Sequence, residues 1–391
     1  MPRALDRCHN IADLRRLAKR RVPAPMFEYI DGAAEDEGTM RRNTAAFDEV
    51  DLVPRYLVDV AATDLSTTVL GAEVEWPVLL APTGMSRLFH WKGEIAVARA
   101  AHRAGTLYSL STLSSHTIED VGAATPGPKM FQIYVLRDAE LNESFAERCR
   151  QSGYGAMCLT VDVPVQGNRE RDLRTGMTIP PSFGPAQYLD VLRHPAWVWN
   201  YLTKPPLRLA NVADRIAQGS SNVSTLAKYI HRQFDPSVTW ERAARMIEHW
   251  DGPFAIKGIL SADDARRAVD IGATAVIVSN HGGRQLDGAP ATIDCLPEIA
   301  AAVGGRAEII LDGGIRRGSH VVKALALGAD ACMIGRAYLY GLGAGGEAGV
   351  DRALAILRRE TERALQLTGC TRLAELDGGF VRRRGVAPEA R

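Results

Sequence analysis

The chain lacks the features that mark exported, membrane-spanning or nucleic-acid-binding proteins. Its 391 residues contain no run of about 18 apolar residues, so no transmembrane helix is expected. The N-terminal stretch MPRALDRCHNIADLRRLAKRRV has no apolar core, and its Asp6 and Asp13 are atypical of an organelle transit peptide. The net charge is only +1, whereas nucleic-acid-binding domains are usually strongly basic. These absences favour a cytoplasmic protein with no nucleic-acid partner.

Cysteine is also scarce, and the spacing of the cysteines gives no sign of a metal site or a disulfide. No two cysteines form a C-x-x-C pair, and Cys158 and Cys332 lie inside apolar runs. We therefore expect reduced, mostly buried thiols, no disulfide and no metal site. The six cysteines are Cys8, Cys149, Cys158, Cys295, Cys332 and Cys370.

Short apolar runs of strand length recur from about residue 77 onward. Continuous runs rich in Val, Ile and Leu are typical of parallel strands that are buried on both faces. Stretches with helical character lie between them, for example 92–104, 138–152, 262–271 and 316–328. The alternation predicts an α/β fold, a (β/α)8 TIM barrel, with a doubly wound sheet as the alternative. The eight runs are PVLLAPTG (77–84), TLYSLST (106–112), KMFQIYV (129–135), AMCLTVD (156–162), PFAIKGI (253–259), TAVIVSN (274–280), AEIILDG (307–313) and ACMIGR (331–336).

A short helical segment is expected before the barrel, with an amphipathic helix over 10–21 that Asn10 caps. A second short helix is expected within 24–39. We predict a single domain over 1–381, with the barrel at about 77–370. The polar segment 382–391 lacks periodicity, which predicts a disordered tail.

One connection is much longer than the others. About 90 residues separate the fourth and fifth strands, and an insertion is predicted at about 170–245. Long insertions in compact domains are usually functional or disordered. This one places Trp197, Trp199 and Tyr201 among basic residues. One interpretation is a lid or a subunit contact; the other is a surface that rests on a membrane, where aromatic and basic side chains favour the interface.

Polar or glycine-rich groups follow every apolar run. The chemistry of TIM barrels collects at the carboxyl ends of the strands, so we expect these groups to line one cleft. They are Pro82, Thr83 and Gly84; Ser111; Gln132 and Tyr134; Thr160 and Asp162; Lys257; Ser279, His281 and Arg284; Asp312, Gly313 and Gly314; and Gly335 and Arg336.

Glycines follow the seventh and eighth runs, in DGGIRRG (312–318) and IGR (334–336). Glycine lets backbone N–H groups approach an anion, and a helix N-terminus favours one. Many barrels bind phosphate after strands seven and eight. The two turns therefore predict a site for a phosphorylated cofactor.

Five residues suggest how a small carboxylate substrate is bound and how a proton is removed from the atoms beside its carboxylate. His281 can take a proton near neutral pH, and Asp162 can orient its imidazole. Arg284 and Arg169 offer planar forks that suit a carboxylate. Lys257 ends an apolar strand, so it either holds negative charge in the cleft or forms a Schiff base, for which its pKa would have to be lowered.

These motifs resemble those of the FMN-dependent L-2-hydroxy acid oxidase and dehydrogenase family, which includes glycolate oxidase, flavin L-lactate dehydrogenase and L-mandelate dehydrogenase. The resemblance covers about residues 10–375 and is carried by SNHGGRQLD, LDGGIRRG, KALALGAD, APTG, FQIYV and LTVDVP. It implies the same barrel, with FMN as the cofactor and oxidation of a 2-hydroxy acid to the 2-oxo acid as the reaction.

The resemblance implies roles for the cleft residues on the substrate side. His281 would be the base and Asp162 would hold its imidazolium. Arg284, Arg169 and Tyr29 would bind the substrate carboxylate, and Tyr134 would bond its hydroxyl.

On the cofactor side, the resemblance implies that Lys257 lies at the N1/O2 edge of the flavin, where positive charge favours electron uptake. The other groups would bind the ring, the ribityl chain and the phosphate. They are Pro82, Thr83, Gly84, Ser111, Gln132, Thr160 and Ser279, then Asp312, Gly313, Gly314, Arg316, Gly335 and Arg336.

Two residues bear on the acceptor and the substrate. Gly84 resembles the dehydrogenase branch, where oxidases tend to carry alanine, and the aromatic insertion resembles that of membrane-associated dehydrogenases. Both favour a quinone or another electron-transport acceptor, with a peripheral position on the inner face of the cell membrane; a peroxide-forming oxidase is the alternative. Leu113 stands where glycolate enzymes carry a bulky aromatic, which predicts a larger pocket that admits lactate or an aromatic hydroxy acid; L-lactate ranks first and mandelate-like acids second. The family also implies a homotetramer.

Overall fold

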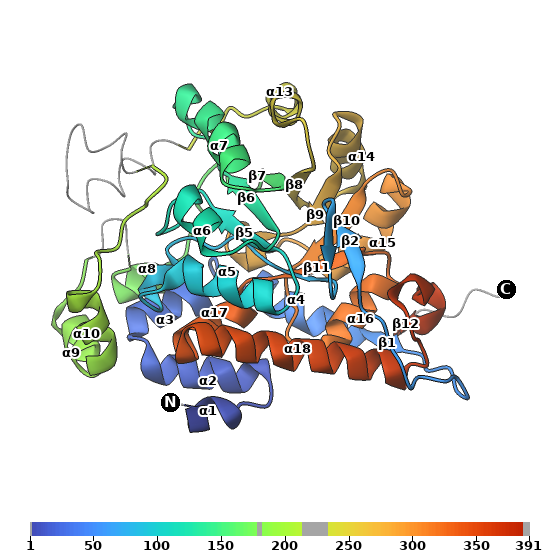
Figure 1. Ribbon diagram of the computed structural model, residues 1–391, viewed down its shortest axis with the longest axis horizontal. Coiled ribbons are helices and arrows are strands. Elements are labelled where there is room, and N and C mark those ends of the chain that lie inside the picture. Colours follow the sequence, from blue (N-terminus) through green and yellow to red (C-terminus); the bar gives the residue numbers. More distant parts are fainter. Residues whose placement is uncertain (1, 178–181, 213–233, 386–391) are drawn as a thin grey trace.

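The computed structural model describes residues 2–177, 182–212 and 234–385, and its centre is a closed barrel of eight parallel strands (Figure 1). The strand order is β10-β11-β4-β5-β6-β7-β8-β9, so the first and last barrel strands in the chain, β4 and β11, pair with each other. The predicted (β/α)8 fold is confirmed. The strands are β4 (Val78–Leu80), β5 (Tyr108–Ser111), β6 (Lys129–Ile133), β7 (Ala156–Thr160), β8 (Phe254–Ile259), β9 (Ala275–Val278), β10 (Glu308–Asp312) and β11 (Ala331–Ile334).

Helices cover the outside of the barrel and follow the predicted alternation. They bury the outward side chains of the strands, so both faces of the sheet are apolar, as continuous Val, Ile and Leu runs require. These helices are α5 (Gly93–Arg103), α6 (Ile118–Ala124), α7 (Ala139–Gln151), α13 (Trp240–Trp250), α14 (Ala262–Asp270), α15 (Thr292–Val303), α16 (Gly318–Ala326), α17 (Arg336–Gly345) and α18 (Glu347–Leu367).

The interior of the barrel is filled by small and medium apolar side chains and closed at its amino end by a hairpin. Alternate residues of each strand point inward, among them Leu79, Met130 and Ile277. The hairpin of β2 (Thr67–Val69) and β3 (Ala72–Val74) packs against this cluster. The N–H of Leu70 at its tip donates to Glu308 at the start of β10, over 2.7 Å. The opposite, carboxyl end is therefore the one that is free for a site.

The segment before the barrel is helical, as predicted. It contains α1 (Pro2–Asp6), α2 (Ile11–Arg21), α3 (Ala24–Asp31), α4 (Gly38–Ala45), the 3-10 turn η1 (Ala46–Glu49) and β1 (Val50–Leu52). Asn10 caps α2 by accepting from the N–H of Asp13 over 2.9 Å. The buried side of α2 contacts α17 and α18 (Figure 1). The N-terminal helices are thus fixed to the last helices of the chain.

The long insertion contributes α8 (Glu170–Thr175), α9 (Pro185–Leu192) and α10 (Pro195–Thr203). Residues 178–181 and 213–233 of the predicted insertion lie outside the described residues. Helices α9 and α10 form a pair at one edge of the molecule, away from the strands (Figure 1). Neither has a buried residue, although both are rich in apolar and aromatic side chains.

Our prediction places the start of the disordered tail too early in the chain. Arg382 and Arg383 belong to β12 (Val381–Arg383), which pairs with β1 in an antiparallel ribbon. Arg383 also forms an ion pair with Asp294, and Arg384 forms one with Asp51. The polar composition of 382–385 reflects these partners and not disorder; residues 386–391 lie outside the described part of the chain.

All six cysteines are buried and unpaired. Within the described ranges, no helix is long and apolar enough to cross a membrane.

Candidate active site

The register of the strands brings the predicted polar residues into one layer at the carboxyl end of the barrel. The inward positions below this layer are apolar, and the last inward position of most strands is polar. Because inward positions repeat every two residues, Asp162 follows Thr160 into the cleft, and Tyr134 follows Gln132. The layer contains Ser111, Gln132, Thr160, Lys257, Ser279, Asp312 and Gly335.

His281, Asp162 and Tyr134 form a connected group at the mouth of the barrel. The Nδ1 of His281 lies 2.9 Å from Oδ1 of Asp162, and its Nε2 lies 3.3 Å from the hydroxyl of Tyr134. The carboxylate fixes the proton on Nδ1, which leaves the Nε2 lone pair directed at the cleft. This is the arrangement of an oriented base beside a phenol.

An unusual backbone conformation presents the imidazole. His281 has a φ of +58°, in the left-handed region, and Gly282 and Gly283 follow with φ of +64° and +74°. Asn280 accepts from the N–H of Gly283, and Ser279 Oγ accepts from the N–H of His281 over 3.1 Å. Strain of this kind at a non-glycine residue is typical of functional sites. The two residues after His281 also have positive φ, which glycine adopts most easily, so β9 is followed by a glycine-rich turn.

The electrostatic environment keeps His281 neutral and Asp162 ionised. Burial lowers the pKa of His281, and the charges of Lys257 and Arg169 add to this effect, outweighing the attraction of Asp162. Burial alone would raise the pKa of Asp162, but the neighbouring His281 and Lys257 lower it below its usual value. A neutral imidazole with an anionic partner can accept a proton near neutral pH.

Lys257 lies inside the barrel, where it contacts two groups of neighbouring strands. Its Nζ lies 2.7 Å from Ser279 Oγ and 2.7 Å from Oδ2 of Asp312. Ser279 in turn donates to the same carboxylate over 2.7 Å. Burial would lower the pKa of Lys257, but Asp312 and Asp162 raise it above its usual value. The ammonium therefore stays charged, which does not favour the Schiff-base interpretation.

Two arginines flank the base and form no salt bridge with any described residue, although the buried carboxylate of Asp172 lies near enough to interact with both charges. Arg284 donates through Nη1 to the carbonyls of Tyr29 (2.7 Å) and Gly32 (2.8 Å), and its guanidinium lies 4.9 Å from the Tyr29 ring centroid. Arg169 is half-buried; its burial lowers its pKa, and Arg284 adds to this effect. A pair of half-buried cations whose direct hydrogen-bond partners are neutral is suited to bind an anion, and a carboxylate matches the guanidinium fork.

The two glycines after β10 form a tight cradle beside α4. Gly313 and Gly314 have φ of +113° and +75°, and a Cβ on Gly314 would overlap the carbonyl oxygen of Asn43. Only glycine fits at Gly314, and glycine turns of this kind let backbone N–H groups approach a phosphate closely. Arg316 is half-buried beside the cradle, and its Nη1 donates to the carbonyl of Ile315.

Arg336 has a more structural environment than expected. Its guanidinium donates to three backbone carbonyls, those of Ile30 (2.9 Å), Gly282 (2.8 Å) and Gly32 (2.7 Å). Burial lowers its pKa to about 10. It therefore ties α3 to the turn that carries His281, in addition to any contact with a phosphate.

Unpaired polar atoms in the upper layer fit the polar edge of a flavin. Ser111 donates to Oε1 of Gln132 over 3.0 Å, whereas Nε2 of Gln132 and Oγ1 of Thr160 are buried without a partner in the described chain. Buried donors are rarely left unsatisfied, so a ligand is expected to pair with them. Together with the charged Lys257 and the glycine cradle, these residues fit FMN.

The segment after β4 completes the wall of the cleft. Thr83 Oγ1 lies 2.7 Å from the hydroxyl of Tyr338, and Pro82 and Gly84 lie on either side of it. A Cβ on Gly84 would lie 3.1 Å from the carbonyl oxygen and 3.2 Å from Cβ of Leu113. The absence of a methyl group at Gly84 therefore permits the close approach of this segment to Leu113.

Sequence reasoning missed the residues that hold the cleft loops together. Asn43 and Asn280 exchange two amide hydrogen bonds, of 2.7 and 2.8 Å. Asp287 accepts from the first N–H groups of α4, and Gln285 bridges the turns after β7 and β9. All but Asn43 lie inside or beside the motif SNHGGRQLD. Their position in that motif was the one feature of the sequence that could have indicated a role at the site.

Comparison with known proteins supports the assignment of this cleft as an FMN site. Residues 18–383 match the family model described as FMN-dependent dehydrogenase. The chain is 42% identical to an L-lactate oxidase of Nostoc sp., covering 95% of this chain and 97% of the relative. It is 42% identical to an L-lactate dehydrogenase of Chromohalobacter salexigens, covering 93% of each.

Two solved structures share the fold over nearly the whole chain. A structure described as the monotopic membrane protein (S)-mandelate dehydrogenase has a TM-score of 0.93 at 38% identity, covering 97% of this chain and 100% of that one. A mandelate oxidase has a TM-score of 0.81 at 38% identity, covering 94% and 96%. The chain therefore belongs to the FMN-dependent dehydrogenase family, whose members oxidise 2-hydroxy acids, and it is an enzyme of that class.

Proposed function

We propose that the enzyme oxidises L-lactate to pyruvate and passes the electrons to a quinone or another non-oxygen acceptor. The observation that carries the proposal is the oriented, neutral His281 beside Tyr134 and two arginines that form no salt bridge within the described chain. A 2-hydroxy acid supplies the matching groups on one carbon: a carboxylate, a hydroxyl and the hydrogen that is lost when the hydroxyl becomes a ketone.

The chain's own residues would bind and deprotonate the substrate. Arg169 and Arg284 would hold the carboxylate, with Tyr29 beside them, and Tyr134 would bond the hydroxyl. Nε2 of His281 would accept one proton, and the ionised Asp162 would stabilise the imidazolium that forms. Bound FMN supplies the two-electron acceptor that turns the alcohol into a ketone.

The residues that fit FMN divide by the part they would contact. Lys257 would place its charge at the flavin ring, where Gln132 and Thr160 offer unpaired polar atoms. The glycine cradle of Gly313 and Gly314 would hold the phosphate. The remaining proposed contacts are Pro82, Thr83, Gly84, Ser111, Ser279, Asp312, Arg316, Gly335 and Arg336.

L-Lactate ranks first because relatives at 42% identity are named for it. A mandelate-type acid is the second candidate, since the structure with a TM-score of 0.93 is named for mandelate. Leu113 is half-buried beside Gly84 and is smaller than an aromatic residue, which leaves room for a larger substrate.

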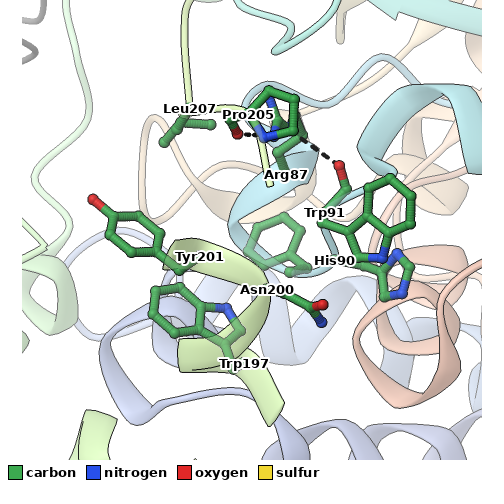
Figure 2. Close-up of a pocket in the computed structure, with 9 residues that line it drawn as sticks. Arg87, His90, Trp91, Trp197, Asn200, Tyr201, Pro205 and Leu207 are labelled. Atoms are coloured by element: carbon green, nitrogen blue, oxygen red, sulfur yellow. Dashed lines mark hydrogen bonds between the residues drawn. The ribbon is translucent and has the colours of Figure 1, made fainter. Parts of the chain in front are cut away.

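The choice of acceptor rests on the insertion. Helices α9 and α10 expose a set of apolar side chains, of which Trp199 is 69% and Leu202 is 73% exposed. Figure 2 shows the pocket at the base of α10, where Trp197 and Tyr201 lie across from His90 and Trp91 and Arg87 donates to the carbonyl of Pro205. The Trp197 and Tyr201 rings stack with centroids 5.2 Å apart, and Nε1 of Trp197 donates to the carbonyl of Leu88 over 2.8 Å. The exposed set is Tyr188, Leu189, Leu192, Trp199, Tyr201 and Leu202.

An exposed apolar surface with basic neighbours suits a membrane interface, where a quinone would be within reach. Lys204 lies 4.8 Å from the ring centroid of Trp91 and is one of these basic neighbours. A peripheral position on the inner face of the membrane follows from this proposal. We retain the homotetramer as a prediction that light scattering of the purified protein would test.

The substrate is tested by mixing the purified yellow protein anaerobically with L-lactate, or with L-mandelate, and following the flavin absorbance. We expect L-lactate to bleach it faster. Faster bleaching by L-mandelate would favour the second candidate, and bleaching by neither would contradict both. Air is then compared with a soluble quinone: rapid recovery in air with peroxide formation would identify an oxidase.

Membrane contact is tested separately by sedimentation with vesicles of phosphatidylethanolamine and phosphatidylglycerol. Replacing Trp199 and Leu202 by serine should release the protein from the vesicles. Leu367→Ser is the matched control, since Leu367 is 71% exposed on α18, outside the insertion. Equal binding of all variants would contradict the proposed surface.

A further inference from the structure

The turn after β9 carries polar side chains that the proposed reaction does not use, and Gln285 is the one that contacts the segment bearing Asp162 and Arg169. Its amide makes four hydrogen bonds, all to the segment that follows β7. Nε2 donates to the carbonyls of Asp162 (3.0 Å) and Val165 (2.8 Å). Oε1 accepts from the N–H of Gly167 (3.3 Å) and from Nη2 of Arg169 (3.2 Å). The capacity of one primary amide is thus used completely.

The two segments are also in direct backbone contact at this point. A Cβ on Gly167 would lie 2.7 Å from Cα of Gln285, so only glycine permits the approach. Nε of Arg169 donates to the carbonyl of Arg284 over 3.3 Å. Gln285 therefore makes four of the hydrogen bonds that join the two turns of the site, which lie more than a hundred residues apart in sequence.

The position of these bonds relates them to the site. One end of the amide fixes the main chain of Asp162, whose carboxylate orients His281. The other end fixes the guanidinium of Arg169, which would bind the substrate carboxylate together with Arg284. An uncharged acceptor is required at this end, because a carboxylate would pair with Arg169 and compete with the substrate.

We propose that Gln285 is a positioning residue that holds Arg169 and Asp162 in place against Arg284 and His281, and so sets the affinity of the site for the substrate carboxylate. This inference rests on the proposed function of those four residues. A shift of about 1 Å in such groups costs up to about a hundredfold in rate, so the effect should be measurable.

Two variants separate the donor and acceptor ends of the amide. Q285M removes all four hydrogen bonds at nearly constant size. Q285E keeps the acceptor for Arg169 but loses the donors to Asp162 and Val165, and it adds a charge. The first measurement is the Kd of pyruvate for the FMN-loaded protein by calorimetry, which needs no turnover. We expect about a tenfold weaker Kd in Q285M and a weaker one still in Q285E.

A double-mutant cycle with R169M tests whether the effect passes through Arg169. Q285M should then weaken pyruvate binding much less in the R169M background than in the unaltered protein, because coupled residues are not additive. L286A is the matched control: Leu286 is the next residue, is 70% exposed, and should leave Kd and kcat unchanged.

The steady-state constants give a second readout. In Q285E, KM should rise more than kcat falls, since the added charge acts on the carboxylate anchor. Unchanged Kd and KM in Q285E and Q285M, with full FMN content, would overturn the inference. Absence of flavin bleaching by any L-2-hydroxy acid in the unaltered protein would instead contradict the proposed function, while the pyruvate Kd would still test the role of Gln285. If Q285M fails to fold, Q285E still tests the loss of the donors to Asp162 and Val165 and the effect of a charge beside Arg169.

Discussion

At the scale of single residues, the site depends on a histidine held in a strained conformation and kept neutral by burial. His281 has a positive φ, and its imidazole is held between Asp162 and Tyr134. The strain is sustained by Asn280 and Ser279, which accept backbone N–H groups on either side. Function here rests on a few hydrogen bonds that over-determine one side chain.

The pH dependence follows from the direction of the His281 shift. A base must be unprotonated, so activity is present above its pKa and is lost as the pH falls through it. Because burial lowers this pKa, the acid limb of kcat/KM should lie below the ordinary value of 6.5. An acid limb at or above that value would contradict the assignment of His281 as a neutral base.

Replacing Asp162 tests the partner of the base. Asp162→Asn removes the charge that raises the pKa of His281, so the acid limb should move to lower pH. The imidazolium also loses its stabilisation, and kcat should fall by a factor of roughly 10² to 10⁴. Stopped-flow bleaching of the flavin measures the rate. A kcat that stays within twofold of the unaltered protein would be inconsistent with this role.

Glycine at the cradle is a further residue-scale requirement. Gly314→Ala should weaken FMN binding and lower the Tm, because its φ is +75° and a Cβ would overlap the backbone of α4. Gly153→Ala separates the two causes: its φ is +71°, but nothing lies near its Cβ. We expect about 1 kcal/mol of destabilisation for Gly153→Ala, from the left-handed backbone alone, and clearly more for Gly314→Ala. Equal Tm values would show that the contact with Asn43 is unimportant.

At the scale of elements, α4 is the support on which both the cradle and the catalytic turn rest. Asn43 on α4 contacts Asn280 through two amide hydrogen bonds, and its carbonyl lies against Gly314. The N-terminus of α4 is capped by Asp287, which accepts from the N–H groups of Gly38 (3.1 Å) and Thr39 (2.7 Å). A loss of this cap should therefore be felt in the site.

Asp287→Ala should destabilise the protein by about 1 to 2 kcal/mol, the usual cost of a lost helix cap, and should weaken FMN binding as well. The measurement is urea unfolding with and without excess FMN. Asp270→Ala is the control, since Asp270 is exposed and forms a surface pair with Arg306, which should contribute little. If both variants lose the same stability, α4 does not support the site.

How far the sequence predicts these elements depends on whether the signal is local. The eight strands are local patterns, and they were predicted correctly. The polar residues that follow them lie at the carboxyl end of the barrel, as expected, and their roles remain predictions. The support from α4 was not predicted, because Asn43 and Asn280 are 237 residues apart and neither side chain marks its partner in the sequence. The strand at Arg382 was missed for the same reason: its partner β1 lies at the other end of the chain. Arg336 was predicted only as a phosphate ligand. Its hydrogen bonds to three backbone carbonyls were not predicted, because those carbonyls are distant in sequence.

At the scale of the whole molecule, residues from all eight strands converge on one end of the barrel, so cofactor binding and global stability should be linked. A ligand that binds only the folded state stabilises it by about 2.7 kcal/mol at a hundredfold excess over Kd. We expect removal of FMN to lower the Tm and added FMN to restore it in a saturable way, as scanning calorimetry would measure. A Tm that does not depend on FMN would contradict a site built from the closed barrel.

The pairing of β4 with β11 has a consequence for synthesis. Val78 pairs with Cys332, so the first strand of the barrel waits for its last neighbour until most of the chain has left the ribosome. Until then the sheet is open, with two unsatisfied edges, and such edges recruit other chains. The N-terminal helices wait as well, since Arg352 of α18 donates to the carbonyl of Cys8. We therefore expect a chain that ends before β11 to aggregate and not to act as a partial enzyme. The yield of folded protein should depend on how quickly β11 pairs with β4 and closes the barrel.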